Sequence, residues 1–182
     1  MVFQNVPRVR RCAFWTVVFS FLAYGYRFFS AGFGGDAALV SLSGQAAYQA
    51  SLGRFLQPVY WLIRGSLVVP SVVGLFTTVF LFLTCWLIAN LFGLNQTRDI
   101  ALLSGLLVTH ETLVVSGATY LPWMDVYTLS LFFAVLGAYL LMSGGRRAWL
   151  SPVFFFLSLG LYQSYLPCAA ALMILALARQ TL

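Results

Sequence analysis

Two of the four acidic residues in this chain stand where a carboxylate could do chemistry. Asp36 lies in GFGGDAAL, just after the first apolar run, and Asp125 lies in LPWMDV, just before another. A carboxylate at a membrane edge is partly desolvated, which raises its proton affinity and suits it to accept a proton from a sugar hydroxyl. Both are therefore candidate catalytic residues. The structural alternative for each is a helix cap, in which the carboxylate accepts hydrogen bonds from free N–H groups.

The other two acids have different surroundings. Asp99, in NQTRD, can cap the apolar run that follows it. Glu111 and the neighbouring His110 lie well inside an apolar run, where ionisable side chains are costly and often functional. Adjacent residues point about 100° apart on a helix, and a lone histidine is a poor metal site. We regard His110 and Glu111 as candidate intramembrane polar residues, with a neutral, hydrogen-bonded Glu111 as the alternative.

Two arginines could bind an anion. The stretch GRFLQPVYWLIRG places four residues at 3-4-3 spacing, on one side of a helix lying in the membrane interface: Arg54, Gln57, Trp61 and Arg64. Pro58 requires a helix break or a helix start nearby. The planar guanidinium fork of arginine suits phosphate. The absence of lysine from the chain is explained equally well by a GC-rich genome.

The elements that position these residues must be membrane helices. The 182 residues are 62% hydrophobic and 8% charged, against roughly 25% charged in a soluble domain. All ten basic residues are arginines near the ends of apolar runs, which fits membrane orientation and argues against a nucleic-acid partner. Three cysteines, Cys12, Cys85 and Cys168, have no metal or disulfide spacing and are expected to be small core residues.

The apolar runs predict about four full spans, because a bilayer core about 30 Å thick needs roughly 20 apolar residues. These runs cover residues 13–30, 67–92, 100–115 and 126–142. The first is expected to be retained as a span, since no convincing signal-peptide cleavage site follows it. Residues 31–66 then form a long outer loop.

The last run, residues 149–178, is too long for one crossing, since 1.5 Å per residue makes it about 45 Å. If Arg8, Arg10 and Arg11 are cytoplasmic, Arg179 prefers the same side. We therefore predict a re-entrant or short helical hairpin with its tip at residues 162–167. One long tilted helix with Arg179 outside is the alternative.

The predicted tip contains polar side chains without charge, Tyr162, Gln163 and Tyr165. They could line a wall that faces a sugar. They could also satisfy backbone groups that the turn frees, and the two roles are compatible.

The order of these features resembles the GT-C membrane glycosyltransferases, and within them the serotype-converting O-antigen glucosyltransferases of the Gtr type. The matching stretches are GFGGDAAL, LGRFLQPVYWLIRG, THETLVVSGATYLPWMDVYTLSLFFAVLGAYLL and LGLYQSYLP. The resemblance implies an all-α, polytopic membrane helical bundle in the bacterial cytoplasmic (inner) membrane. It also implies transfer of a hexose, expected to be glucose, from a polyprenyl-phosphate carrier to a surface glycan such as O-antigen on the outer face.

By the same resemblance, Asp36 is the general base, and Asp125 has a supporting or metal-binding role. Arg54 is the first candidate to bind the carrier phosphate, and Arg64 is the second. The resemblance leaves open whether a divalent metal is required.

The chain departs from the family pattern in two ways. Many relatives carry paired acids in the first loop, whereas Asp36 is followed by Ala37. Relatives are also usually longer, so residues 1–182 are expected to be a single transmembrane domain and the N-terminal module of a longer enzyme. The alternative function is a non-enzymatic, flippase-like carrier or membrane subunit for lipid-linked sugar. A carrier should place polar groups such as His110 and Glu111 along the path across the membrane.

Overall fold

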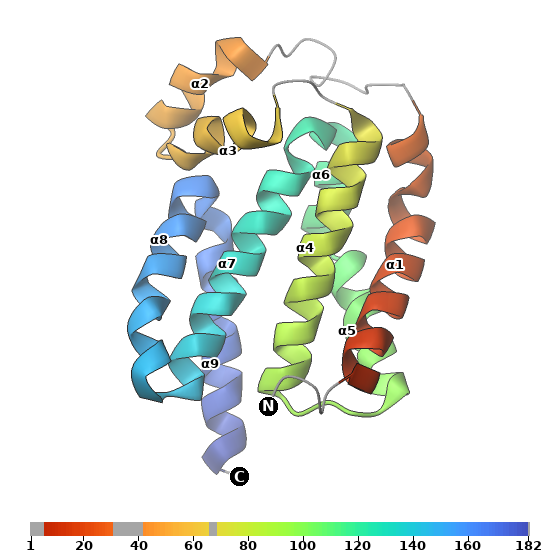
Figure 1. Cartoon of the computed structure of the whole chain (residues 1–182), viewed down its shortest axis with the longest axis vertical. Helices are drawn as coiled ribbons and strands as arrows, with labels where there is room; N and C mark the ends of the chain where they lie inside the picture. Colours follow the sequence, from red (N-terminus) through yellow and green to blue (C-terminus); the bar gives the residue numbers. More distant parts are fainter. Residues whose placement is uncertain (1–5, 31–41, 66–68, 182) are drawn as a thin grey trace.

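The computed structural model describes residues 6–30, 42–65 and 69–181, and the regular structure in these residues is all helical. Figure 1 shows an upright bundle with two short helices lying across one end. The α-helices are α1 (Val6–Phe29), α2 (Leu42–Ser51), α3 (Leu56–Arg64), α4 (Pro70–Leu91), α5 (Thr97–Val108), α6 (Glu111–Thr119), α7 (Met124–Ser143), α8 (Ser151–Leu161) and α9 (Leu166–Thr181). In the described residues, the 3-10 turns between helices are η3 (Leu121–Trp123), η4 (Gly145–Leu150) and η5 (Gln163–Tyr165).

Three of the predicted spans are single helices. Helices α1 and α4, and α7 together with η3, are each long and apolar enough to cross a membrane. Helix α1 begins at Val6 rather than near residue 13, because the arginine-containing stretch before the apolar run is also helical. The all-α membrane bundle predicted from the sequence is therefore confirmed.

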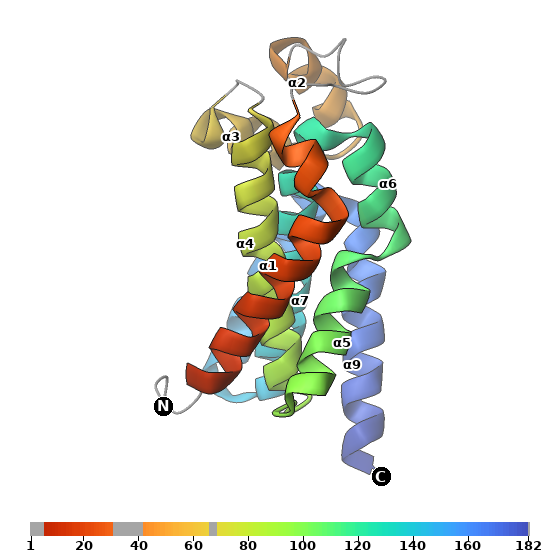
Figure 2. The same ribbon diagram turned by 90° about the vertical axis from the view of Figure 1, so that its right-hand side faces the viewer.

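The third predicted span, residues 100–115, is not one helix. Helix α5 ends at Val108, α6 starts at Glu111, and the two are bent by 45° (Figure 2). The physical reason is a new helix start inside the apolar run: the His110 side chain accepts a hydrogen bond from the backbone N–H of Thr112 through Nδ1, at 3.3 Å. By length and composition, α5 and α6 together qualify as a fourth candidate span, either a broken crossing or a re-entrant loop.

The last apolar run forms the predicted hairpin. Helix α8 runs towards the end of the bundle that carries α3, η5 makes the turn, and α9 runs back (Figures 1 and 2). The arms have 11 and 16 residues, so neither α8 nor α9 alone has the length of a typical full span. The alternative of one long tilted helix is therefore wrong.

Helix α7 lies at the centre and packs against α4, α8 and α9. Every residue from Leu121 to Leu131 is buried. Small residues allow close helix contacts, as is common in membrane bundles. At Gly137 of α7, an added Cβ would lie 2.7 Å from the ring of Phe155 in α8. At Gly74 of α4, it would overlap the ring of Phe28 in α1.

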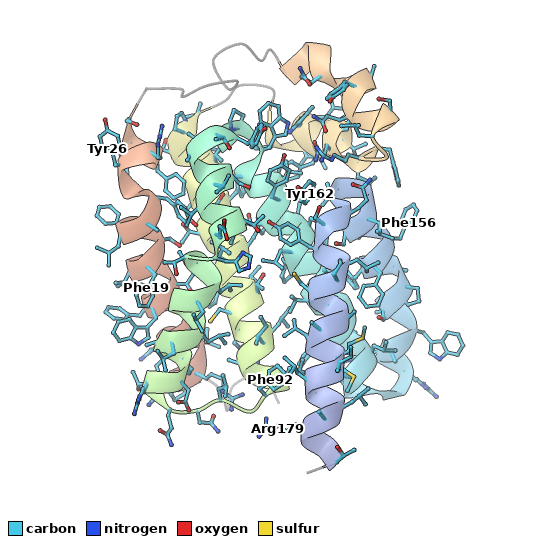
Figure 3. All side chains as sticks on the ribbon, turned by 180° about the vertical axis from the view of Figure 1, so that it is seen from behind. Phe19, Tyr26, Phe92, Phe156, Tyr162 and Arg179 are labelled. Atoms are coloured by element: carbon cyan, nitrogen blue, oxygen red, sulfur yellow. The ribbon has the colours of Figure 1, made fainter. Side chains whose placement is uncertain are left out.

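The two ends of the bundle differ in composition. The arginine end carries the start of α1, the α4–α5 loop, η4 and the end of α9. Its basic residues are Arg8, Arg10, Arg11, Arg98, Arg146, Arg147 and Arg179. There Arg8 donates to Asn90 and Asn95. Arg179 donates to the Phe92 carbonyl, and Figure 3 shows both residues at this end. The opposite end carries α2, α3, η3 and η5. The orientation in which the arginine end is cytoplasmic stays a prediction.

Candidate active site

A tight turn between α2 and α3 positions Arg54. Gly53 has a φ of +80°, a left-handed conformation that favours glycine. The backbone N–H of Arg54 then donates to the Gln49 carbonyl at 2.9 Å, which closes the end of α2. The chain therefore reverses direction immediately before α3, and Arg54 lies between the two helices.

One side of helix α3 is buried and the other is exposed, as the spacing of its residues predicts. Gln57 and Trp61 are buried, whereas Leu62 and Ile63 are 85% and 81% exposed. The Gln57 side chain donates from Nε2 to the Leu161 carbonyl at 2.7 Å, so α3 is tied to the end of α8. Pro58 lies in the first turn of α3, where its missing N–H leaves no helical hydrogen bond unmade.

A cavity of about 620 Å³ lies at this end of the bundle, and we call the end the cavity end. Its walls come from α2, the α2–α3 turn, α6, η3, α7 and the residue before η5. The lining residues are Gln45, Tyr48, Gln49, Leu52, Arg54, Thr112, Val115, Ser116, Tyr120, Trp123, Tyr127 and Tyr162. The cavity therefore combines one cation with aromatic, amide and hydroxyl groups.

Arg54 is held in the cavity wall by two side chains. Its guanidinium carbon lies 4.7 Å from the centre of the Tyr162 ring, and its Nη1 donates to the Gln49 Oε1 at 3.1 Å. The Tyr162 ring also lies 4.4 Å, centre to centre, from the ring of Tyr127. Figure 3 shows Tyr162 at the cavity end of the bundle. Arg54, Tyr162 and Tyr127 thus form a stack that orients the guanidinium.

The cavity wall also carries donors without partners. Arg54 Nε and Trp123 Nε1 are buried and have no hydrogen-bond partner in the part of the chain that the structure describes. The Trp123 side chain is only 5% exposed, so its indole N–H is removed from bulk water. Unpaired buried donors are costly, and a ligand rich in oxygen acceptors would satisfy them.

Asp125 and Arg64 form a buried ion pair beside the cavity. Their side chains are 0% and 2% exposed, and Arg64 Nη1 lies 2.7 Å from Asp125 Oδ2. Tyr60 donates to the same carboxylate oxygen at 2.9 Å, and the Val126 N–H donates to Oδ1 at 2.9 Å. Burial and then the Asp125 charge raise the pKa of Tyr60, so its hydroxyl remains a donor. The network fixes the end of α3 to the start of α7.

The other residues predicted from the sequence lie outside these two groups. Gln163 donates from Nε2 to the Leu52 carbonyl at 2.9 Å, so it ties the hairpin tip to the α2–α3 turn. Tyr165 is buried and does not line the cavity, whereas Tyr162 does. His110 and Glu111 are exposed at the α5–α6 break. The structure thus joins Arg54 with Tyr162, and Arg64 with Asp125.

Asp36 lies outside the described residues. Asp99 is in the first turn of α5 but is not its cap, because the N-cap residue is Gln96 and no side chain makes the capping bond. Within residues 6–30, 42–65 and 69–181, no group of three or more His, Cys, Asp or Glu side chains could hold a metal ion.

Sequence analysis missed most of the cavity lining. Tyr48 and Gln49 come from α2. Tyr120 precedes η3, Trp123 ends η3, and Tyr127 is in the first turn of α7. A signal for the second group exists in TYLPWMDVY, where three aromatic residues surround a helix start. Aromatic residues are also common at membrane interfaces, so this pattern alone does not indicate a ligand site.

Comparison with known protein families gave one finding that bears on this site. Residues 35–182 match the sequence model of a family described as Glucosyl transferase GtrII. Comparisons with curated proteins and with solved structures gave no match. The matched region includes the cavity lining, the Arg64–Asp125 pair and Asp36.

Proposed function

The chain belongs to the GtrII glucosyl transferase family, and we propose that it transfers a glucosyl group from a polyprenyl-phosphate carrier to a surface glycan such as O-antigen. The observation that carries this proposal is the cavity in which Arg54 is stacked on Tyr162. A volume of about 620 Å³ lies in the usual range for ligand sites, roughly 300–1,000 Å³. The proposed working face is the outer face of the bacterial cytoplasmic membrane.

Arg54 is the proposed ligand of the carrier phosphate. Its guanidinium is oriented by Tyr162 and Gln49 before a ligand binds, so little side-chain entropy is lost on binding. Arginine can bind phosphate through two parallel hydrogen bonds. The negative charge on the phosphate group grows as it leaves the sugar, and a fixed cation stabilises that charge.

The proposed transfer is a single displacement with inversion. The acceptor hydroxyl oxygen attacks the anomeric carbon of glucose, and the bond from that carbon to the phosphate oxygen breaks. The carrier phosphate leaves with the bonding electron pair, while the acceptor proton passes to Asp36 as general base. The support for Asp36 is the resemblance of GFGGDAAL to the first-loop acid of the family.

We propose a supporting role for Arg64 and Asp125. Both oxygens of Asp125 already accept hydrogen bonds, and its side chain is fully buried. Arg64 binds Asp125 and the Pro122 carbonyl through Nη1, while its buried Nε and Nη2 have no partner among the described residues. These residues are therefore positioning residues that hold α3, and with it the turn that carries Arg54.

The test uses membranes that carry the chain, with polyprenyl-phosphate-glucose labelled in the sugar and O-antigen as acceptor. Labelled glucose should appear in the glycan. Asp36→Asn is nearly isosteric but cannot act as a base, so transfer should fall to background. Asp99→Asn, an acid at the arginine end, is the matched control and should keep its activity. Movement of the lipid-linked sugar across the membrane without transfer would instead favour the carrier alternative.

A further inference from the structure

The break between α5 and α6 exposes a polar stretch in the middle of a membrane crossing. Thr109, His110, Glu111 and Thr112 are consecutive, and all four are exposed. Helix α5 has 12 residues and α6 has 9, so at 1.5 Å per residue the break lies about 18 Å and about 14 Å from the two ends of the crossing. Non-helical backbone and ionisable side chains at such depth require water or protein around them.

The cavity lies next to this break, although neither His110 nor Glu111 is among the residues that line it. Thr112, Val115 and Ser116 of α6 line it. Glu111 is next to Thr112 and one helical turn before Val115, so it lies at the edge of the cavity-lining face. Leu113 and Gly117 occupy the buried face of the same helix. The break is therefore at the membrane-side edge of the cavity, below the turn that carries Arg54.

The two ionisable side chains at this edge offer complementary hydrogen-bonding groups. Because His110 Nδ1 accepts from the Thr112 N–H, the neutral imidazole carries its proton on Nε2, which is then a donor. Glu111 makes no ion pair or side-chain hydrogen bond with any described residue, so its carboxylate oxygens are acceptors. A donor next to a strong acceptor matches the hydroxyl groups of a sugar.

We propose that His110 and Glu111 form a subsite that binds the ring hydroxyls of the transferred hexose while Arg54 binds its phosphate. This inference rests on the proposed function and adds the residues that select the sugar. A site built to hydrogen-bond a substrate hydroxyl discriminates strongly against an analogue that lacks it, because the protein groups are left unpaired. Glu111 is thus a specificity-determining residue.

The first test does not depend on measuring glucose transfer. Glu111→Cys and Leu106→Cys are made in a background lacking Cys12, Cys85 and Cys168, and vesicles of both orientations are treated with a membrane-impermeant thiol reagent. Leu106, 72% exposed on α5, is the matched control for a lipid-facing position. We expect the reagent to label Glu111→Cys, and polyprenyl-phosphate-glucose to reduce that labelling. Leu106→Cys should stay unlabelled. Absence of labelling, or labelling that the donor does not reduce, would overturn the subsite.

The second test is the choice of donor. In Glu111→Gln the KM for polyprenyl-phosphate-glucose should rise about tenfold or more, and the preference for glucose over a deoxyglucose donor should shrink by a similar factor, with Asp99→Asn unchanged. An unchanged preference in Glu111→Gln would overturn the inference while leaving the proposed function intact. If the wild-type chain transfers no glucose, the proposed function fails, and the labelling experiment still decides whether Glu111 borders a site that the donor occupies.

Discussion

The arginine side chains have different surroundings at the two ends of the bundle. At the arginine end, Arg8, Arg11 and Arg179 donate to the neutral amides and carbonyls of the α4–α5 loop from partly or fully exposed positions. At the cavity end, Arg64 is buried against a carboxylate and Arg54 is stacked on an aromatic ring. The same side chain therefore makes hydrogen bonds near the surface at one end, and a buried ion pair and an aromatic contact at the other.

The difference follows from desolvation. An exposed arginine keeps most of its hydration, so its position tolerates change and its hydrogen bonds contribute little. A buried arginine needs a partner for its charge, and removal of that partner leaves an uncompensated charge. Substitutions at the cavity end should therefore have much larger effects than similar substitutions at the arginine end.

The largest effect should come from breaking the buried ion pair. Asp125→Ala leaves the Arg64 charge buried without its partner, which should cost about 3–5 kcal/mol of stability. Unfolding of the purified chain in detergent, followed by circular dichroism against a denaturing detergent, measures this loss. The double variant Asp125→Leu with Arg64→Met should recover much of the stability, because no lone charge remains. Equal stability of the wild type and Asp125→Ala would contradict the comparison.

The next effect is on activity rather than on folding. Arg54→Ala removes the cation proposed to stabilise the leaving phosphate, so transfer should fall about 10²–10³-fold with little loss of stability. Arg54→Lys should restore part of the rate, since lysine keeps the charge but not the planar fork. Arg146→Ala at the arginine end is the matched control, and an equal loss there would remove the distinction between the two ends.

Two glycines at helix contacts, Gly160 and Gly137, allow a further comparison of the effects of substitution. Gly160→Ala would place a Cβ 2.7 Å from Leu56 and so push α3 away from α8 at the cavity end. Gly137→Ala would place one 2.7 Å from Phe155, between α7 and α8. Each should cost about 1–3 kcal/mol. Glucose transfer, measured on variants that remain folded, should fall in Gly160→Ala and persist in Gly137→Ala, because only the first disturbs the support of Arg54.

The smallest effect should come from the arginine end. Arg8→Gln removes hydrogen bonds to Asn90 and Asn95 near the surface, so stability should change by less than about 1 kcal/mol and transfer should be unchanged. The same unfolding and transfer assays measure both quantities. A loss as large as that of Asp125→Ala would show that the two ends are equally sensitive.

The fold was predictable where hydropathy and charge carry the information. Long apolar runs give α1, α4 and α7, and the charge of Arg179 correctly favours a hairpin in the last run. The break between α5 and α6 was missed, because hydropathy averages over His110 and Glu111 and does not detect a helix cap. The side chain that makes the cap, His110, is visible in the sequence, but its capping geometry is not.

The site was predictable only in part. The spacing of Gln57, Trp61 and Arg64 gives the buried face of α3 correctly. The pairing of Arg64 with Asp125 joins residues 61 positions apart, and nothing local in either stretch specifies it. The cavity arises where segments far apart in the sequence meet, so its aromatic lining follows from packing rather than from a motif. The role of Asp36 stays a prediction.

The most direct test of the central claim is to find where the donor binds. A photoactivatable polyprenyl-phosphate-glucose, reacted with membranes that carry the chain, should cross-link to peptides from α6, η3 and the start of α7. Arg54→Ala should remove that cross-link, while Arg146→Ala should leave it in place. Cross-links confined to other surfaces, or unchanged in Arg54→Ala, would contradict the assignment of the cavity as the glucosyl transfer site.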